Sequence, residues 1–241
     1  MDEHLFMVEK PCPVCGKSTR LLKTRSRLFA VKTDEDFCVH YKNFNPYYYK
    51  IWMCEHCGYS TDEKTFLTKL PEPQREKLWE FVSQKNLAVE FNEERGLPEA
   101  VASYELALRF LDVIGAPASK HGAFNLQLAW IYRDAGESYA EQEKEQMIKA
   151  AEYYDEAIMM ERFPIGNLTD NAAMYLVGAI YYRIGDIDKC SQHLSRIIGD
   201  QSIRTREPQV YEKARNLWSD VREQQAAKKK ADAAAAAAAK K

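Results

Sequence analysis

The sequence contains two matching motifs, CPVCG at residues 12–16 and CEHCG at residues 54–58. In each motif two residues separate the cysteines, so one tight turn presents both sulfurs to a single ion. The glycine after the second cysteine suits the unusual backbone conformation of such a turn. Four thiolates make a closed tetrahedral Zn²⁺ site with no open position for water, which predicts a structural zinc ion. An iron–sulfur cluster is the alternative cofactor on the same ligands. The predicted metal ligands are Cys12, Cys15, Cys54 and Cys57.

The 38 residues between Cys15 and Cys54 exceed the roughly 15–20 that are common between two such cysteine pairs. We therefore expect an insertion. Short stretches rich in aromatic, β-branched and alternating apolar residues, at 19–23 and 47–53, are typical of strands. Residues 1–70 are accordingly predicted to form a small β zinc ribbon with an insertion.

The pattern changes after residue 70. Apolar residues recur at helical spacing up to about residue 225, and Gly or Pro residues interrupt the pattern. Residues 128–137 align with 177–186, an offset of 49 residues. A second helix is predicted after each of these segments, and an earlier copy of the same helix pair is predicted before them. Apolar residues recur at matching spacing in the three predicted second helices. They are Ala100, Tyr104 and Ala107; Ala150, Tyr154 and Ala157; and Cys190, Leu194 and Ile197.

These segments resemble the tetratricopeptide repeat, although the usual period is about 34 residues. The predicted fold is mainly α: the β zinc ribbon followed by an α-solenoid of about three tetratricopeptide-like helix pairs. The predicted domains are residues 1–70, residues 71–225 and an Ala/Lys-rich low-complexity tail at 226–241. On this interpretation Cys190 is a core residue.

An α-solenoid of this kind lines its concave face with the first helix of each pair. The repeat pattern predicts a groove there whose cations and aromatic rings suit an acidic peptide or a carboxylate. The alternative is ordinary surface charge. The predicted groove residues are Lys85, Asn92, Trp130, Arg133, Tyr182 and Arg183.

Within the insertion, Cys38 and His40 are candidate ligands of a second metal, with His4 as a possible third, or Cys38 is a redox-sensitive thiol. The alternative is that Cys38 is a small buried residue beside aromatic rings. His56 lies between the two cysteines of its own motif, and we expect it to point to solvent.

Charge is unevenly distributed along the chain. The net charge is −2 overall, +2 over residues 1–70, −8 over 71–225 and +4 over 226–241. The small total argues against a protein that binds nucleic acid through bulk positive charge. A basic stretch lies on the first predicted hairpin, with Phe29, Tyr41 and Phe44 nearby, and it is either a nucleic-acid surface or a solvated strand face. The basic residues are Lys17, Arg20, Lys23, Arg25, Arg27 and Lys32.

The first ten residues have acids where a secretory signal carries Lys or Arg, and the longest apolar stretch, 172–182, is about half of a membrane span. We expect a cytoplasmic protein with no membrane association. In that reducing compartment, clustered cysteines favour metal binding over disulfides.

The order of features resembles an uncharacterised bacterial two-domain family. The most specific residues are Asn45-Pro46 with Tyr49, and Cys57-Gly58-Tyr59. The resemblance implies a cytoplasmic bacterial protein with a zinc ribbon and carries no established activity. No catalytic constellation is evident, because the zinc ligands leave no open position and no Gly-rich phosphate loop is present. The predicted function is a non-enzymatic adaptor or scaffold that binds a partner protein through its helical repeats. The alternative is a nucleic-acid-binding regulator that uses the basic face of the ribbon.

Overall fold

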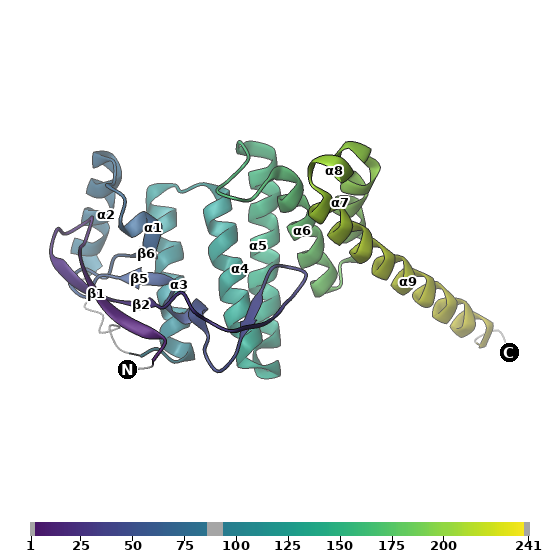
Figure 1. Ribbon diagram of the computed structural model, residues 1–241, viewed down its shortest axis with the longest axis horizontal. Helices are drawn as coiled ribbons and strands as arrows, with labels where there is room; N and C mark the ends of the chain where they lie inside the picture. Colours follow the sequence, from purple (N-terminus) through teal and green to yellow (C-terminus); the bar gives the residue numbers. More distant parts are fainter. Residues whose placement is uncertain (1–2, 86–93, 239–241) are drawn as a thin grey trace. The chain divides into compact units, whose positions relative to one another are not determined.

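The computed structural model describes the backbone of residues 3–85 and 94–238 and the side chains of residues 3–84 and 94–226. The fold is mainly α, as predicted, with short strands near the N-terminus (Figure 1). The helices are α1 (Glu63–Phe66), α2 (Glu72–Lys85), α3 (Leu97–Ile114), α4 (Ala118–Ala135), α5 (Ala140–Met160), α6 (Asp170–Ile184), α7 (Ile187–Gly199), α8 (Gln201–Arg206) and α9 (Pro208–Ala238). Two 3₁₀ helices, η1 (Pro46–Tyr49) and η2 (Glu137–Tyr139), join longer elements.

The strands form antiparallel pairs. The pairs are β1 (Leu5–Pro11) with β2 (Ser18–Thr24), β3 (Ala30–Thr33) with β4 (Val39–Tyr41), and β5 (Ile51–Met53) with β6 (Ser60–Asp62). In the first pair Leu5 lies opposite Thr24 and Pro11 opposite Ser18, so residues 12–17 form the hairpin tip. Residues 54–59 likewise connect β5 to β6. Each cysteine motif therefore occupies the tip of a hairpin.

The strand predicted at residues 19–23 is confirmed as part of β2, but the strand predicted at 47–53 is wrong over its first half. Residues 46–49 form η1, because Asn45 caps this turn by accepting a hydrogen bond from the Tyr47 N–H at 2.9 Å. Pro46 occupies its first turn, where the fixed φ of proline is already helical. The strand begins only at Ile51.

Glycine residues end two of the long helices, in line with the interruptions by Gly or Pro in the helical pattern. α3 ends at Gly115 and α6 at Gly185, both in the left-handed conformation that glycine adopts without strain. α6 begins after Thr169, whose hydroxyl accepts a hydrogen bond from the Ala172 N–H. None of the described helices combines the length and the apolar composition that a membrane crossing requires. The tetratricopeptide assignment stays a prediction.

The chain divides into two compact units. Unit 1 contains residues 1–34 and 38–150, and unit 2 contains residues 35–37 and 151–241. This division does not coincide with the predicted ranges 1–70 and 71–225. The reason is that β5, β6 and η1 pack on α3, so the strands and the first helices share one core.

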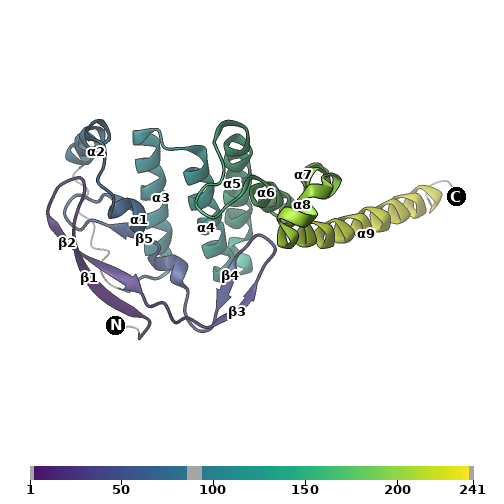
Figure 2. The ribbon, with the colours of Figure 1, turned by 45° about the horizontal axis from the view of Figure 1, so that its top comes forward.

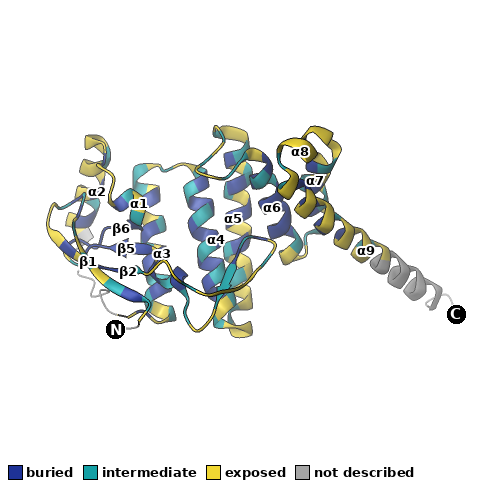
Figure 3. Ribbon diagram, in the orientation of Figure 1, coloured by how far each residue is buried: buried dark blue, intermediate teal, exposed yellow. Residues whose placement is uncertain are grey.

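The core of unit 1 has two large clusters. One surrounds the cysteine motifs and includes Trp52, Tyr59, Phe66 and Phe110. The other joins the insertion to α3 and α4. On α3 its members Ala100, Tyr104 and Ala107 are fully buried and follow one face of the helix, as the sequence pattern predicted. Figure 3 shows buried residues concentrated on the inward faces of α3 and α4 and along β5.

Unit 2 has its own core, formed by α6, α7 and α9. Cys190 is fully buried there, as predicted, and burial raises the pKa of its thiol to about 12. Gly178 allows α7 to approach α6 closely: a Cβ at this position would lie 3.1 Å from Cδ2 of Leu194. Phe37, from the residues between β3 and β4 that belong to unit 2, packs its ring 5.6 Å from the ring of Tyr175.

The buried Tyr104 hydroxyl generates a stability prediction. It lies 3.1 Å from the Tyr47 carbonyl oxygen and 2.9 Å from Oε1 of Gln127, so it joins η1, α3 and α4. Tyr104→Phe leaves these acceptors without their donor, which we expect to lower the free energy of unfolding by about 1–3 kcal/mol. Urea denaturation measures the change.

The matched control is Tyr154→Phe, because Tyr154 is also buried and its hydroxyl has no hydrogen-bond partner among the described residues. We expect it to change stability by less than about 0.5 kcal/mol. Equal effects of the two substitutions would contradict a specific role for the Tyr104 hydroxyl.

Candidate metal centre

The four predicted ligands lie together. Their sulfur atoms are all within 4.8 Å of one another, and none forms a disulfide. Sγ of Cys12 lies 3.7 Å from Sγ of Cys57, and Sγ of Cys15 lies 3.7 Å from Sγ of Cys54. A tetrahedron with Zn–S bonds of about 2.3 Å has edges of about 3.8 Å. The spacing therefore suits one metal ion bound by all four sulfurs, which we call the thiol tetrad.

The two hairpin tips have the same backbone geometry. The Cys12 N–H donates to the Lys17 carbonyl and the Gly16 N–H to the Cys12 carbonyl, both at 2.9 Å. In the second tip Cys54 donates to Tyr59 at 2.9 Å and Gly58 to Cys54 at 2.8 Å. Gly16 has a φ of 75° and Gly58 a φ of 73°, so the expectation that these glycines supply a left-handed residue is confirmed.

Hydrogen bonds also join the two hairpins beside the tetrad. The Glu55 N–H donates to the Thr19 hydroxyl at 3.1 Å, and the Glu55 carboxylate accepts from the Arg20 backbone and guanidinium, both at 3.2 Å. His56 is exposed, as expected. Its Nε2 also lies 2.8 Å from the Ser18 carbonyl oxygen of the first hairpin.

The tetrad is largely removed from water. Cys12, Cys54 and Cys57 are buried among apolar neighbours, and Cys15 is partly exposed. The neighbouring Cys54 sulfur and burial raise the pKa of Cys12, whereas Cys12 and Cys57 lower the pKa of Cys54. The sulfurs therefore influence one another's ionisation. A bound dication offsets the repulsion, so that all four sulfurs can ionise.

A second group of metal-ligand types lies in the β3–β4 hairpin. Ligand atoms of Asp34, Cys38 and His40 are within 4.8 Å of one another. His4, the other predicted ligand, is not in this group, and its ring packs 5.1 Å from that of Phe44. The hairpin thus brings two of the three predicted residues together and adds Asp34, which sequence analysis missed.

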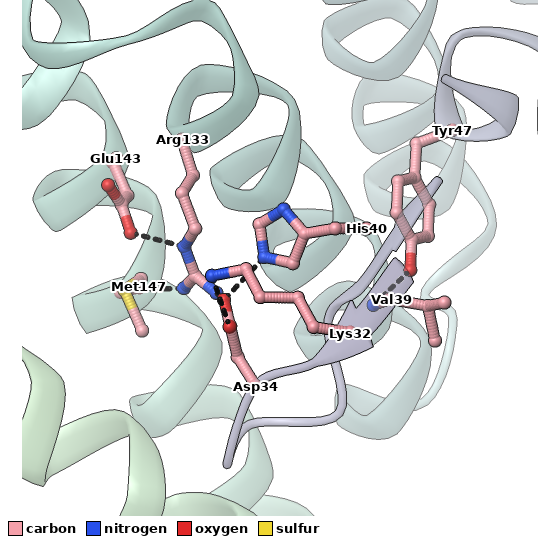
Figure 4. Close-up of polar contacts among 8 residues, drawn as sticks. All are labelled: Lys32, Asp34, Val39, His40, Tyr47, Arg133, Glu143 and Met147. Atoms are coloured by element: carbon pink, nitrogen blue, oxygen red, sulfur yellow. Dashed lines mark hydrogen bonds and ion pairs between the residues drawn. The ribbon is translucent and has the colours of Figure 1, made fainter. Parts of the chain in front are cut away.

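The Asp34 carboxylate already has cationic partners. It lies 2.6 Å from Nε2 of His40, 3.1 Å from Nζ of Lys32 and 2.9 Å from Nη1 of Arg133 (Figure 4). Arg133 in turn donates from Nε to Glu143 of α5 at 2.8 Å. We call Lys32, Asp34, His40, Arg133 and Glu143 the ion-pair cluster. A metal ion on Asp34 would meet the positive charges of Lys32 and Arg133, so the charges favour ion pairing over metal binding here.

Arg133 was predicted to line a partner groove, but its side chain is 7% exposed and lies between Asp34 and Glu143. It fastens the β3–β4 hairpin to α4 and α5 within unit 1, and Figure 2 shows this hairpin beside α4. Trp130 is half-buried, with its ring 5.1 Å from that of Tyr47.

The other predicted groove residues lie in different parts of the chain. Tyr182 and Arg183 belong to unit 2, where the Tyr182 hydroxyl lies 2.7 Å from Nε2 of Gln224 and Arg183 is exposed. The Lys85 side chain and Asn92 lie outside the described residues. The groove stays a prediction. Arg133 forms hydrogen bonds with Glu143 and Asp34 inside the fold.

Sequence analysis also missed Arg95. This buried residue donates from Nη1 to the carbonyl oxygens of Tyr48 at 3.1 Å and Ile51 at 2.8 Å, and its N–H donates to the Tyr49 hydroxyl at 3.0 Å. Burial lowers its pKa to about 10. Its role is to hold η1 and the start of β5 beside α3. No periodic pattern marks such a residue.

A family model supports the sequence resemblance. The model for an uncharacterised protein conserved in bacteria (DUF2225) matches residues 5–221. The matched range includes the thiol tetrad and the ion-pair cluster. No curated protein and no solved structure matches the chain.

The ion-pair cluster generates a pH prediction. Burial opposes ionisation of Asp34, but hydrogen bonds from His40 and Lys32 and the charge of Arg133 outweigh it and lower the pKa to about 2, from a usual value of 3.8. Ionised Asp34 therefore stabilises the fold fully above about pH 4. We expect Asp34→Asn to lower the free energy of unfolding by about 1–3 kcal/mol at pH 7. This difference from the wild type should shrink as the pH falls from about 4 towards 2.

Urea denaturation at a series of pH values measures this difference. Asp220→Asn, on the exposed face of α9, is the control for loss of a carboxylate as such. A deficit of Asp34→Asn that stayed constant down to pH 2, or that matched the deficit of Asp220→Asn, would contradict the assigned role.

Proposed function

The chain belongs to this family of uncharacterised bacterial proteins, and we propose that it is a non-enzymatic, zinc-binding adaptor of the cytoplasm. The observation that carries the proposal is the thiol tetrad, with four sulfurs within 4.8 Å and three of them on buried cysteines. A metal with four protein ligands has no open position for water or substrate, which favours a structural role. Four reduced cysteines suit a reducing compartment.

Zinc is the metal that fits these ligands best. Multi-iron clusters distribute the four thiolates over two or four irons, which spreads the sulfurs beyond the spacing of a mononuclear site. A single iron with four thiolates has the same geometry as zinc. The metal must therefore be identified by elemental analysis and by colour.

We expect the full-length protein, purified under reducing conditions, to contain one zinc per chain and to be colourless. Cys54→Ser should remove the metal, because it deletes a fully buried ligand. It should also lower the free energy of unfolding by at least about 3 kcal/mol and the melting temperature by about 6–12 °C. Mass spectrometry of metal content and calorimetry measure these changes.

Cys38→Ser and Cys190→Ser are the controls, since both cysteines are buried and lie outside the tetrad. Each should keep one zinc per chain. A metal-free wild type, or a Cys54→Ser variant that kept its zinc, would contradict the proposal. Iron in place of zinc would appear as visible absorption of the purified protein.

We place the partner-binding surface next to the metal centre. A cavity of about 270 Å³ lies beside Cys15 and is lined by Val14, Cys15, Arg75, Glu76 and Trp79. The Trp79 side chain projects from α2 and is 51% exposed. Tryptophan and arginine are the residues that most often dominate the energy of protein interfaces, which supports a protein partner at this cavity.

A photoreactive amino acid at position 79 tests this surface in the native host. We expect a discrete protein adduct from position 79 and none from position 77, an exposed residue on the other side of α2. Trp79→Ala should weaken co-purification of the same partner at least tenfold, with metal content unchanged. The same adducts from both positions, or none from either, would contradict the proposed surface.

A further inference from the structure

We propose that a basic hollow on unit 1 binds the phosphodiester backbone of single-stranded nucleic acid. The hollow has a volume of about 740 Å³ and lies where β1, β2, the following loop and η1 meet. Its cations are Lys23, Arg25, Arg27 and Lys50, and its aromatic rings are Phe6 and Tyr41. This proposal concerns a different surface and a different class of partner from the adaptor proposal, and either stands without the other.

Charge complementarity selects an anionic ligand. The lining contains four basic side chains and no carboxylate among the described residues. Lys23 forms an ion pair with Glu63, so its charge is partly neutralised. Among the described residues, Arg27 and Lys50 form no ion pair, and both are exposed. Three cations therefore remain for a ligand that carries repeated negative charge.

Contacts within the fold hold one of these cations in position. Arg25 donates from Nε to the Glu3 carbonyl oxygen at 3.0 Å, and its guanidinium lies 5.4 Å from the centre of the Phe6 ring. Its backbone N–H donates to the His4 carbonyl at 2.8 Å. A guanidinium that is already ordered loses little conformational freedom when it binds a phosphate.

The aromatic residues favour a single strand over a duplex. Tyr41 lines the hollow, and Phe29 in the loop between β2 and β3 exposes 72% of its surface. Exposed rings among cations are the combination with which proteins bind single strands, because unpaired bases stack on the rings while the cations contact phosphates. A duplex keeps its bases stacked inside the helix and offers the rings no such surface.

Fluorescence anisotropy with labelled 12-nucleotide single strands of DNA and RNA tests the proposal. The probe protein is the full chain with its metal. With three phosphate contacts, the logarithm of the binding constant should fall with the logarithm of salt concentration with a slope of about −2. Binding should therefore weaken about 20-fold between 50 and 200 mM salt. No binding at 50 mM salt, or binding that salt does not weaken, would overturn the proposal.

Charge reversal locates the site. Arg27→Glu with Lys50→Glu should weaken binding at least tenfold and reduce the magnitude of the slope to about 1 or below, since only one unneutralised cation remains. Lys64→Glu with Lys77→Glu makes the same change in net charge at exposed positions outside the hollow and should have less than a threefold effect. Equal losses of affinity in the two double variants, or no loss in the first, would overturn the assignment to this hollow. Binding by the basic tail would give such a result.

Two further comparisons test the nature of the ligand. Phe29→Ala removes an exposed ring and should weaken binding of the single strand about fivefold or more without affecting stability. A 12-base-pair duplex and an inorganic polyphosphate of similar charge should bind less tightly than the single strand. Equal or tighter binding of either competitor would overturn the proposal for a single strand.

Discussion

The spacing of four sulfur atoms is the constraint on which the N-terminal half of the structure depends. Sulfurs that share one ion must lie about 3.8 Å apart, and this requirement brings together two cysteine pairs that are separated by 38 residues of sequence. Each pair of sulfurs occupies the tip of a hairpin, so bringing the tips together also fixes the directions of β1–β2 and β5–β6. The second hairpin packs on α3, which connects the metal centre to the helices of unit 1.

The insertion is fastened by different chemistry. Its β3–β4 hairpin contacts the helices through Asp34 and Arg133, which are 13% and 7% exposed, and Arg133 continues to Glu143. Partly buried ion pairs contribute modest net stability, because removing charges from water costs nearly as much as the pairing gains. A misplaced hairpin would nevertheless be strongly destabilised, since either charge alone would remain buried without its partner. A metal bound by the thiol tetrad would therefore contribute more of the stability, whereas the ion-pair cluster determines where the insertion lies.

Local features could be predicted from the sequence, and features that join distant segments could not. The thiol tetrad follows from two motifs whose geometry is contained in five residues each, and helix ends such as Gly115 and Gly185 follow from single residues. The composition of residues 47–49 favoured a strand, but the cap from Asn45 made a 3₁₀ helix. Arg133 followed the repeat pattern of a groove residue, yet its partner Asp34 lies 99 residues earlier in the chain. No period in the sequence marks such a pair.

The local charge of the N-terminal segment likewise depends on contacts between residues that are distant in the sequence. Six basic residues stood out in the sequence, and a net charge of +2 over residues 1–70 suggested that they are largely balanced. The structure balances three of them individually: Arg20 with Glu55, Lys23 with Glu63, and Lys32 with Asp34. Arg25 and Arg27 are left on the same side of the hairpin as Lys50, around one hollow. A segment that is almost neutral in sum is therefore locally basic, and a polyanion responds to this local charge because screening confines its attraction to about 10 Å.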